Sequence, residues 1–285
     1  MVATLEKKLR KLRLRLKKLR SVVVAFSGGV DSTFLLAVAS RVLRGHILAV
    51  TALSGTYPAS EARDARVAAR RLGVRHCFIR THELKNPVFR LNPPDRCYHC
   101  KKELFKRLNA VALRHRMRYV IDGSNADDLR DYRPGAAAKT AAKVVSPLCD
   151  AGLTKKEIRL ASRELGLATW RKPAMACLAS RIPYGSVITR RRLLRIQKAE
   201  EVVRDVCGIR GNLRVRDFGP LAKIEVDPAE MRLLESAVGL KGMLKMAGYA
   251  DMQIDPRGYR MGSLNEGRTR RHPLSHKENN GKNIF

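Results

Sequence analysis

Two serines and two glycines follow a short apolar run near the start of the chain, where a strand would give way to a helix. Paired glycines let the backbone turn tightly, and the helix that follows contributes the positive end of its dipole. This combination predicts a cradle for phosphate or pyrophosphate, and an ordinary turn is the alternative. The six residues are Ser27, Gly28, Gly29, Val30, Asp31 and Ser32.

The side chains of this segment add chemistry to the predicted cradle. Ser27 and Ser32 offer hydroxyl groups to phosphate oxygens, and Asp31 can hold a Mg²⁺ ion that neutralises a pyrophosphate leaving group. The glycine spacing matches neither the loop that ends in Gly-Lys-Ser/Thr nor the dinucleotide fingerprint with three spaced glycines. We therefore expect a phosphate site of another class, with one magnesium ligand built in.

A second polar group follows a later apolar run. Asp127, Asp128 and Asp131 come after the expected strand at 119–122, and in a parallel sheet they would face the same crevice. Asp127 is a candidate contact for ATP or for a second metal ion, and Arg133 is a candidate to steady the phosphates. Carboxylates that cap helices are the alternative explanation for the acidic residues.

Three cysteines form a third group. Cys97 and Cys100 have CxxC spacing in what two preceding prolines predict to be a loop, and Cys177 lies in an irregular stretch. A [4Fe–4S] cluster normally takes four thiolates, so three that converge would leave one iron free to bind sulfide. The alternatives are a zinc site that includes His99, a redox-active CxxC pair, and unrelated thiols. The cysteines expected only to pack are Cys77, Cys149 and Cys207.

Two arginines, Arg214 and Arg216, lie two positions apart on a predicted strand. Their side chains must therefore point to the same face of that strand. A paired cationic face suits a substrate that carries a phosphate or carboxylate. In so basic a protein, a solvated strand face is the alternative.

The elements that must position these residues alternate between strand and helix. This order is typical of an α/β fold with a doubly wound parallel sheet, whose ligand lies at the carboxyl ends of the strands. A capping box at Thr154 and Glu157 starts one of the helices. We expect strands at 22–26, 47–53, 75–80 and 119–122, and helices at 33–43, 59–72, 103–116 and 154–165.

A stretch rich in proline and glycine, residues 166–185, marks a boundary. Beyond it we expect a smaller α+β domain with a helix at 190–206, a helix from Pro228, and strands at 213–218, 223–227 and 249–254. The predicted division is an ATP-binding domain with a basic N-terminal helix at 1–170, a substrate and sulfur-transfer domain at 171–264, and a disordered basic tail at 265–285.

Leucines recur every three or four residues near the N-terminus, with lysines and arginines between them. Such a stripe predicts a helix that packs its leucines on the first domain. Contact with RNA or an anionic membrane, and an arginine-rich import sequence, are the alternatives. The leucines are Leu5, Leu9, Leu12, Leu16 and Leu19.

Charge is the most unusual feature of the composition. The 285 residues include 58 Lys and Arg against 26 Asp and Glu, a net charge of +32 that favours a polyanionic partner. The charge is spread along the chain, so a compositional bias of surface positions is the alternative. No apolar run reaches the length of a membrane helix, and six cysteines are too few for a disulfide scaffold. We expect a cytoplasmic homo-oligomer that does not associate with membranes.

Four blocks of the sequence resemble the LarE family of the PP-loop ATP pyrophosphatases, which cleave ATP between its α and β phosphates. They are residues 26–33, which resemble the SGGxDS loop, and residues 125–135, 172–185 and 214–216. Family members are ATP-dependent sulfurtransferases. They convert pyridinium-3,5-biscarboxylic acid mononucleotide to its thiocarboxylated forms, on the route to the nickel-pincer cofactor of lactate racemase.

The resemblance implies that ATP adenylates a substrate carboxylate and that sulfur then displaces AMP. One branch of the family sacrifices the sulfur of a single cysteine, which matches Cys177. Another branch holds a [4Fe–4S] cluster on three cysteines, which match Cys97, Cys100 and Cys177. This chain has all three, so we assign it to the cluster branch, with Cys177 at the catalytic centre. A tRNA thiolation enzyme, and a nucleotide- and RNA-binding protein without turnover, are the alternatives.

The resemblance also assigns the remaining candidate residues. The expected substrate-binding residues are Arg181, Arg214 and Arg216. Either Glu200 or Glu201 is expected to serve the site as well. The residues expected to bind ATP and Mg²⁺ are Ser27, Gly28, Gly29, Asp31, Ser32, Asp127 and Arg133.

Overall fold

The structure is a computed structural model, and it describes residues 2–130, 134–173, 176–260 and 262–265. Asp131, Arg133 and the predicted tail beyond residue 265 lie outside the described residues, so the roles expected of them remain predictions.

The first domain contains a four-stranded sheet in the order β3-β2-β1-β4. Its strands are β1 (Val22–Ala25), β2 (Ile47–Leu53), β3 (His76–Arg80) and β4 (Tyr119–Ile121). Every pairing between them is parallel, so all four carboxyl ends lie along one edge. The segments that follow the strands therefore meet at that edge, as the predicted fold requires.

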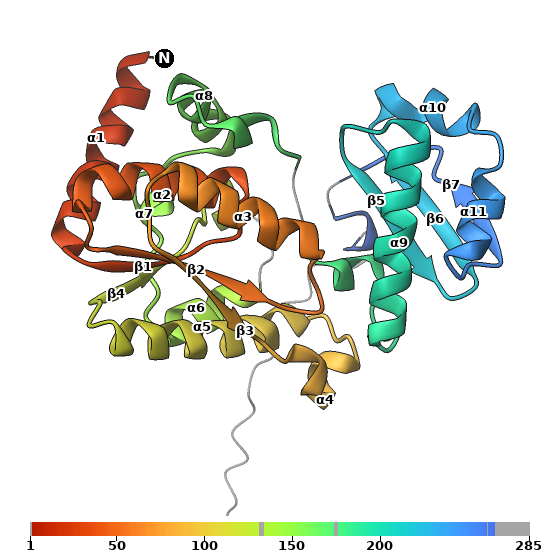
Figure 1. The fold of residues 1–285 in the computed structure, drawn as a ribbon, viewed down its shortest axis with the longest axis horizontal. Helices are drawn as coiled ribbons and strands as arrows, with labels where there is room; N and C mark the ends of the chain where they lie inside the picture. The colour runs from red at the N-terminus through yellow and green to blue at the C-terminus, as the bar shows by residue number, and fades with distance from the viewer. Residues whose placement is uncertain (1, 131–133, 174–175, 261, 266–285) are drawn as a thin grey trace, which may run out of the picture.

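Helices cover both faces of this sheet (Figure 1). Side chains alternate along a strand, so Val22 and Val24 pack on one side of β1 and Val23 packs on the other. The prediction of a doubly wound α/β fold is confirmed. One face carries α1 (Val2–Leu19), α2 (Val30–Leu43), α3 (Ala59–Arg71) and α8 (Lys155–Glu164), and the other carries α5 (Arg96–Arg114) and α6 (Gly135–Ala141).

The N-terminal helix α1 packs its leucine stripe on the first domain, as predicted. Leu12 and Leu16 are fully buried, and each contributes about 2 kcal/mol of hydrophobic stabilisation. At the polar border of the helix, Lys8 donates to Glu157 at 2.7 Å and Arg15 donates to Asp150 at 2.8 Å. The stripe therefore has a structural role.

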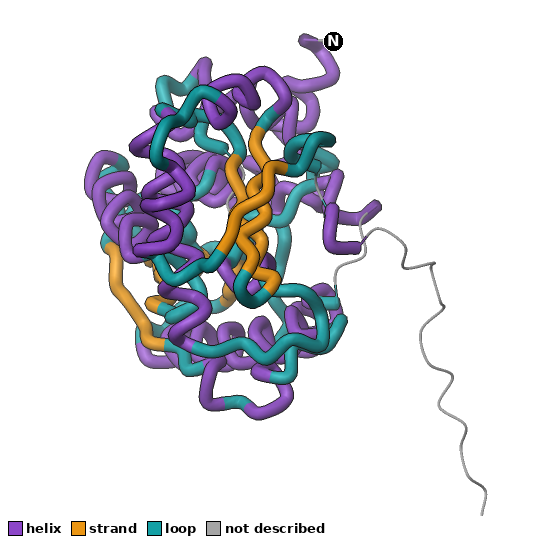
Figure 2. The backbone as a smooth tube through the Cα atoms, turned by 90° about the vertical axis from the view of Figure 1, so that its right-hand side faces the viewer, coloured by secondary structure: helices purple, strands orange, loops and turns teal. Residues whose placement is uncertain are grey.

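The second domain has its own apolar core and a three-stranded sheet in the order β5-β6-β7. The pair β5–β6 is antiparallel and the pair β6–β7 is parallel. Figure 2 views the molecule from the side of this domain. Its elements are α9 (Arg190–Cys207), β5 (Leu213–Phe218), β6 (Leu221–Val226), α10 (Met231–Glu235), α11 (Leu240–Met246) and β7 (Asp251–Ile254).

The segment that joins the domains is fastened to the first one. Leu178 N–H donates to the Thr56 carbonyl at 2.7 Å, and the Asn92 amide donates to the carbonyls of Ile182 and Pro183 at 3.1 and 2.7 Å. A separate apolar cluster contains residues from this segment, from α9 and from the short helix α4 (Pro87–Arg90). The linker residues are therefore held in place.

One prediction about local structure is wrong. The sequence pattern places Cys97 and Cys100 in a loop, with the next helix starting at 103, but α5 already begins at Arg96. The two prolines at 93 and 94 precede a helix whose N-cap position is Asp95, and proline is well tolerated just before a helix starts. Both thiols therefore project from the first turns of α5.

Candidate functional site

The loop after β1 has the geometry of an anion cradle. Gly29 is the N-cap residue of α2 and offers no side chain to the first N–H groups of that helix, so these donors are left for a ligand. The hydroxyl oxygens of Ser27 and Ser32 lie 3.1 Å apart, and the Ser32 hydroxyl also donates to the Gly29 carbonyl at 3.2 Å. Hydroxyl and backbone donors therefore converge at the start of α2.

Two glycines allow close backbone approach around this loop. Gly28 has φ +70°, and a β-carbon there would lie 3.0 Å from the Ala65 Cα of α3. Gly123, which follows β4, would place a β-carbon 3.0 Å from the Ser32 backbone nitrogen. The glycine after β4 was not predicted to matter, and it packs directly against the phosphate loop.

Asp31 has one carboxylate oxygen in use and one without a partner. Its Oδ2 pairs with the ammonium group of Lys155, the first residue of α8. Its Oδ1 is buried and has no hydrogen-bond partner among the described residues. A buried carboxylate oxygen without a partner is costly, and oxygen is the ligand atom that Mg²⁺ prefers. Asp31 therefore fits the magnesium role predicted for it.

The acidic residues after β4 act largely as caps for the backbone. Asp127 Oδ2 accepts from the Lys155 N–H at 2.7 Å, and Asp128 Oδ2 accepts from the Asn125 N–H at 3.1 Å. These contacts agree with the alternative explanation, in which the acidic residues cap backbone N–H groups. Asp127 and Asp31 nonetheless contact the same lysine, so Asp127 lies beside the loop. Sequence reasoning missed Lys155, although the capping box predicted the helix that carries it.

The three predicted cysteines share one electrostatic environment. Burial raises the pKa of the Cys100 thiol, and the charges of Glu83, Cys177 and Cys97 raise it further. The pKa of the Tyr57 hydroxyl is also raised, first by burial of that group, although 40% of the residue is exposed, and then by Cys177, Cys100 and Cys97. Cys100 and Cys177 also pack against the same apolar cluster, so the fold brings Cys177 to the side of α5 that carries Cys100.

The thiols are not arranged as a preformed metal site. Within the described part of the chain, no three His, Cys, Asp or Glu side chains are placed closely enough to hold a metal ion. His99, the residue of the zinc alternative, has its Nε2 3.4 Å from Asp95 Oδ2. Cys97 is exposed, whereas Cys100 and Cys177 are half-buried.

Glu83 is a polar residue of the site that sequence reasoning missed. It is buried and accepts hydrogen bonds from Ser54 and Thr81, both at 3.0 Å. Its Oε1 lies 3.7 Å from Cys100 Sγ. Glu83 comes shortly after β3, and a carboxylate just beyond a strand of a parallel sheet is the signal that could have found it.

Arg181 holds the Cys177 segment in place. It is fully buried and donates to both oxygens of Glu200, at 2.8 and 3.0 Å, and to the carbonyls of Ala176 and Cys177, at 2.6 and 3.1 Å. All of these partners belong to the protein itself, so the guanidinium group positions the backbone beside Cys177. Of the two glutamates considered, Glu200 pairs with Arg181, whereas Glu201 accepts from Gln197 on the exposed face of α9.

Arg214 and Arg216 are buried, so the alternative of a solvated strand face is wrong. Burial, with the nearby charge of Arg181, lowers the pKa of Arg214 to about 10. Arg216 donates to the Ser180 carbonyl at 2.9 Å and to Glu225 at 2.7 Å, while its Nε is buried without a partner among the described residues. The pair therefore lies against the segment that carries Cys177.

Asp217 belongs to the other face of β5. It is fully buried and forms ion pairs with Arg192 at 2.8 Å and Arg195 at 2.6 Å, both on α9. The Tyr249 hydroxyl lies 3.3 Å from the same carboxylate. These contacts join α9 to the sheet of the second domain, so part of the basic character of α9 is structural.

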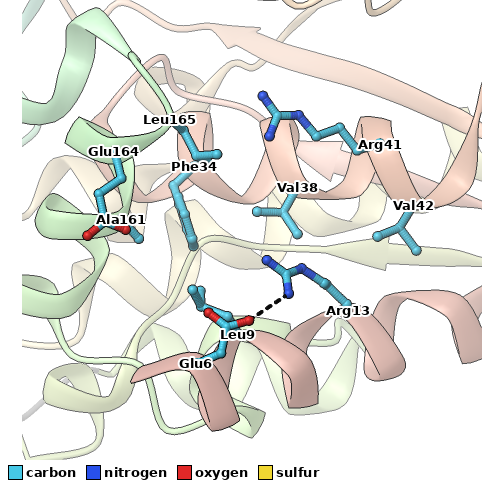
Figure 3. Close-up of a pocket in the computed structure, with 10 residues that line it drawn as sticks. All are labelled: Glu6, Leu9, Arg13, Phe34, Val38, Arg41, Val42, Ala161, Glu164 and Leu165. Atoms are coloured by element: carbon cyan, nitrogen blue, oxygen red, sulfur yellow. Dashed lines mark hydrogen bonds and ion pairs between the residues drawn. The ribbon is translucent and has the colours of Figure 1, made fainter. Parts of the chain in front are cut away.

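A cavity of about 370 Å³ lies between α1, α2 and α8 (Figure 3). Apolar side chains such as Phe34 and Val38 line it, and an ion pair between Arg13 and Glu6, at 3.2 Å, borders it. None of the residues predicted for phosphate, metal or substrate contact lines this cavity. It is therefore not part of the candidate site.

None of the helices in the described ranges combines the length and the apolar character that crossing a membrane requires.

Comparison with known proteins gives a consistent set of relatives. A family profile described as asparagine synthase matches residues 6–127. An uncharacterised protein of Synechocystis is 40% identical, over 92% of this chain and 98% of its own length. The pyridinium-3,5-bisthiocarboxylic acid mononucleotide synthase of Lactiplantibacillus plantarum is 34% identical, over 93% of this chain and 96% of its own. An uncharacterised protein of Methanocaldococcus jannaschii is 29% identical, over 89% and 98%.

The similarity extends over nearly the full length of the chain. It is consistent with the features described above: the phosphate loop after β1, the parallel sheet, and the shared packing of Cys100 and Cys177. The chain belongs to the LarE family and is an ATP-dependent enzyme with a PP-loop domain.

Proposed function

We propose that the protein is a sulfurtransferase that adenylates a carboxylate of pyridinium-3,5-biscarboxylic acid mononucleotide and then replaces AMP with sulfur. The name of the Lactiplantibacillus relative supports the substrate. The observation that carries the proposal is the position of the cysteines. The segment of Cys177 is hydrogen-bonded to Thr56, which lies just beyond β2, and the phosphate loop lies just beyond the neighbouring strand β1. Both segments therefore lie at the carboxyl edge of the same sheet.

In the first half-reaction, a carboxylate oxygen of the substrate attacks the α phosphorus of ATP. The bond to the bridging oxygen of the β phosphate breaks, and pyrophosphate leaves with the electron pair. The N–H groups at the start of α2 and the hydroxyls of Ser27 and Ser32 stabilise the charge on the leaving phosphates. Asp31 would hold Mg²⁺, which supplies further neutralisation when bound, and Lys155 keeps the other carboxylate oxygen fixed.

In the second half-reaction, a sulfide sulfur attacks the acyl carbon of the adenylate. The carbon–oxygen bond to AMP breaks, AMP leaves with the electron pair, and a thiocarboxylate forms. Arg181 and Glu200 fix the backbone at Cys177, where this exchange takes place. Arg216, which has an unpartnered buried Nε, and Arg214 are the proposed contacts for the anionic groups of the substrate.

Cys97, Cys100 and Cys177 are the proposed ligands of a [4Fe–4S] cluster. Three thiolates would leave one iron of such a cluster without a protein ligand, and Cys100 and Cys177 already pack against the same apolar cluster of residues. When bound, the cluster supplies an iron site for the sulfide. Burial and the neighbouring Glu83 raise the pKa of Cys100, and binding of a metal to a thiol requires the loss of its proton.

An anaerobic assay with ATP, Mg²⁺, sulfide and the bis-carboxylated mononucleotide tests the function. Mass spectrometry should show the mass change for replacement of one oxygen by sulfur, together with AMP and pyrophosphate. Formation of thionucleosides in added tRNA, with no change in the mononucleotide, would contradict the proposal.

A further inference from the structure

The edge of the parallel sheet opposite the phosphate loop carries a row of basic residues. In a parallel α/β domain, helices end and the next strands begin at this amino edge, away from the carboxyl ends. In Figure 1 the arrowhead of β2 points toward the second domain, so the amino edge lies at the other end of the sheet. We name six residues the basic edge: Arg20, Arg44, Arg75, Arg116, Arg118 and Lys143.

Backbone hydrogen bonds show that the basic edge is continuous across the strands. Val22 N–H donates to the His46 carbonyl at 3.1 Å, and Arg118 N–H donates to the Ser21 hydroxyl at 3.1 Å. Ala49 N–H donates to the Arg75 carbonyl at 2.9 Å. Neighbouring strands lie about 4.8 Å apart, so the basic residues before them form a row rather than isolated charges.

The charge of this row is not neutralised locally. All six side chains are exposed, and within the described ranges none of them takes part in an ion pair, a side-chain hydrogen bond or a ring contact. The segments that contribute them contain no Asp or Glu at 17–22, 41–47, 70–76, 114–119 or 142–145. The same segments hold further exposed arginines. An uncompensated positive potential therefore extends along the whole edge.

The backbone supplies a second, independent observation. Arg20, Arg44, Arg116 and Lys143 have φ between +43° and +64°, and they are four of the five non-glycine residues with positive φ in the part of the chain described. Such left-handed positions at helix ends usually hold glycine, because a β-carbon is strained there. A long basic side chain at all four positions is not explained by packing.

We propose that the basic edge binds the phosphate backbone of nucleic acid without reading its sequence. Guanidinium groups bind phosphate in a bidentate manner, and a row of cations matches the linear series of phosphates along a strand. A membrane-binding surface would also need apolar side chains to insert, and large exposed apolar groups between the basic residues are few, chiefly Leu113 and Tyr119. The bound nucleic acid lies at the opposite edge from the PP-loop and is not a substrate.

The test measures fluorescence anisotropy of a labelled DNA duplex of about 20 base pairs with the full-length protein at several salt concentrations, since each phosphate contact adds about 0.9 to the salt slope. In the first variant, Arg20, Arg44 and Arg116 are each replaced by Gly, which removes three charges and relaxes three strained positions. The salt slope should fall by about 2.7, and binding at about 0.1 M salt should weaken at least tenfold. Its melting temperature should not fall below that of the wild type, because strain is relieved, and its rate of pyrophosphate release should be unchanged.

Two further variants form a matched pair. Arg75→Gln, Arg118→Gln and Lys143→Gln together should weaken binding to a similar degree. Arg190→Gln, Arg191→Gln and Arg210→Gln remove the same number of exposed charges from the second domain and should leave the salt slope unchanged. Equal loss in this control, or no duplex binding by the wild type at about 0.1 M salt, would overturn the proposal. Binding to phosphatidylserine vesicles but not to the duplex would instead identify a membrane surface.

Discussion

The two edges of the parallel sheet have opposite characters. At the carboxyl edge, polar groups such as Glu83 and Arg181 are buried and paired, and Gly123 lets backbones approach closely. At the amino edge, Arg116 and the rest of the basic edge are exposed, and four of the six residues occupy strained positions where glycine would fit better. Group transfer needs fixed groups shielded from water, whereas docking of a polyanion needs only accessible charge.

Replacing Cys97 by Ser should have the largest effect on the carboxyl edge. Protein purified anaerobically should be brown and contain about four irons per chain, and the variant should be colourless with almost none, because two thiolates do not hold the cluster. Elemental analysis checks this. The matched control is Cys77→Ser, whose thiol lies in β3 and should not affect the iron content. Zinc in place of iron in the wild-type protein would contradict the assignment.

Replacing Glu200 by Ala should strongly destabilise the carboxyl edge. The substitution leaves the fully buried guanidinium of Arg181 without its carboxylate, and breaking a buried pair in this way costs about 3–5 kcal/mol. Chemical denaturation measures the loss. The control Glu201→Ala removes an exposed carboxylate of the same helix and should change stability by less than about 0.5 kcal/mol. Similar losses for both variants would show that the buried ion pair between Arg181 and Glu200 does not contribute this stability.

Replacing Asp31 by Ala should lower the rate of pyrophosphate release at least 100-fold, an effect of roughly the size seen when one transition-state contact is removed. The iron content should stay at the wild-type level, since Asp31 is not among the proposed cluster ligands. Asp128→Asn is the matched control, because Asp128 caps the Asn125 backbone rather than holding the proposed metal ion. An unchanged rate in the Asp31 variant would refute the metal role.

Adding and removing a β-carbon at the two edges should have unequal effects. Gly123→Ala places a methyl group 3.0 Å from the Ser32 nitrogen, and such overpacking costs about 1–3 kcal/mol, so the KM for ATP should rise. Arg116→Gly relaxes a residue at φ 54° and should change stability by no more than about 1 kcal/mol. Steady-state kinetics and thermal melting check both. A harmless Gly123→Ala would mean that the loop is not tightly packed.

The smallest expected effect is on the pH dependence of stability, through Glu157, which pairs with Lys8 of α1. Burial alone would raise the pKa of Glu157, but hydrogen bonds from Lys8 and Thr154 outweigh it, so the pKa is lowered. The contribution of Glu157 to stability is therefore present above its unfolded pKa and is lost as the pH falls through the lowered value. The melting temperature of Glu157→Gln should lie below that of the wild type at neutral pH and converge with it in acid. A constant difference would contradict this linkage.

Local patterns in the sequence predicted most of the fold. Apolar runs gave β2 at the observed bounds, and Thr154 with Glu157 gave the start of α8, because both signals depend on neighbouring residues. The start of α5 was missed because two prolines were interpreted as a loop, whereas Asp95 lies at the N-cap of a helix.

The candidate site could be predicted only where its functional residues lie close together in one segment of the sequence. The phosphate loop is such a segment. Glu83 and Lys155 were missed because their partners, Cys100 and Asp31, come from distant parts of the chain. Alternation along β5 predicted that Arg214 and Arg216 share a face, but their burial depends on how the second domain packs, which local spacing does not encode.

The sharpest test compares the two half-reactions in wild-type protein and in Cys177→Ala, with ATP, Mg²⁺, sulfide and the mononucleotide present together. We expect the wild type to yield both pyrophosphate and thiocarboxylate, and the variant to release pyrophosphate but form no sulfur product. Thiocarboxylate from the variant at the wild-type rate would refute sulfur transfer at Cys177.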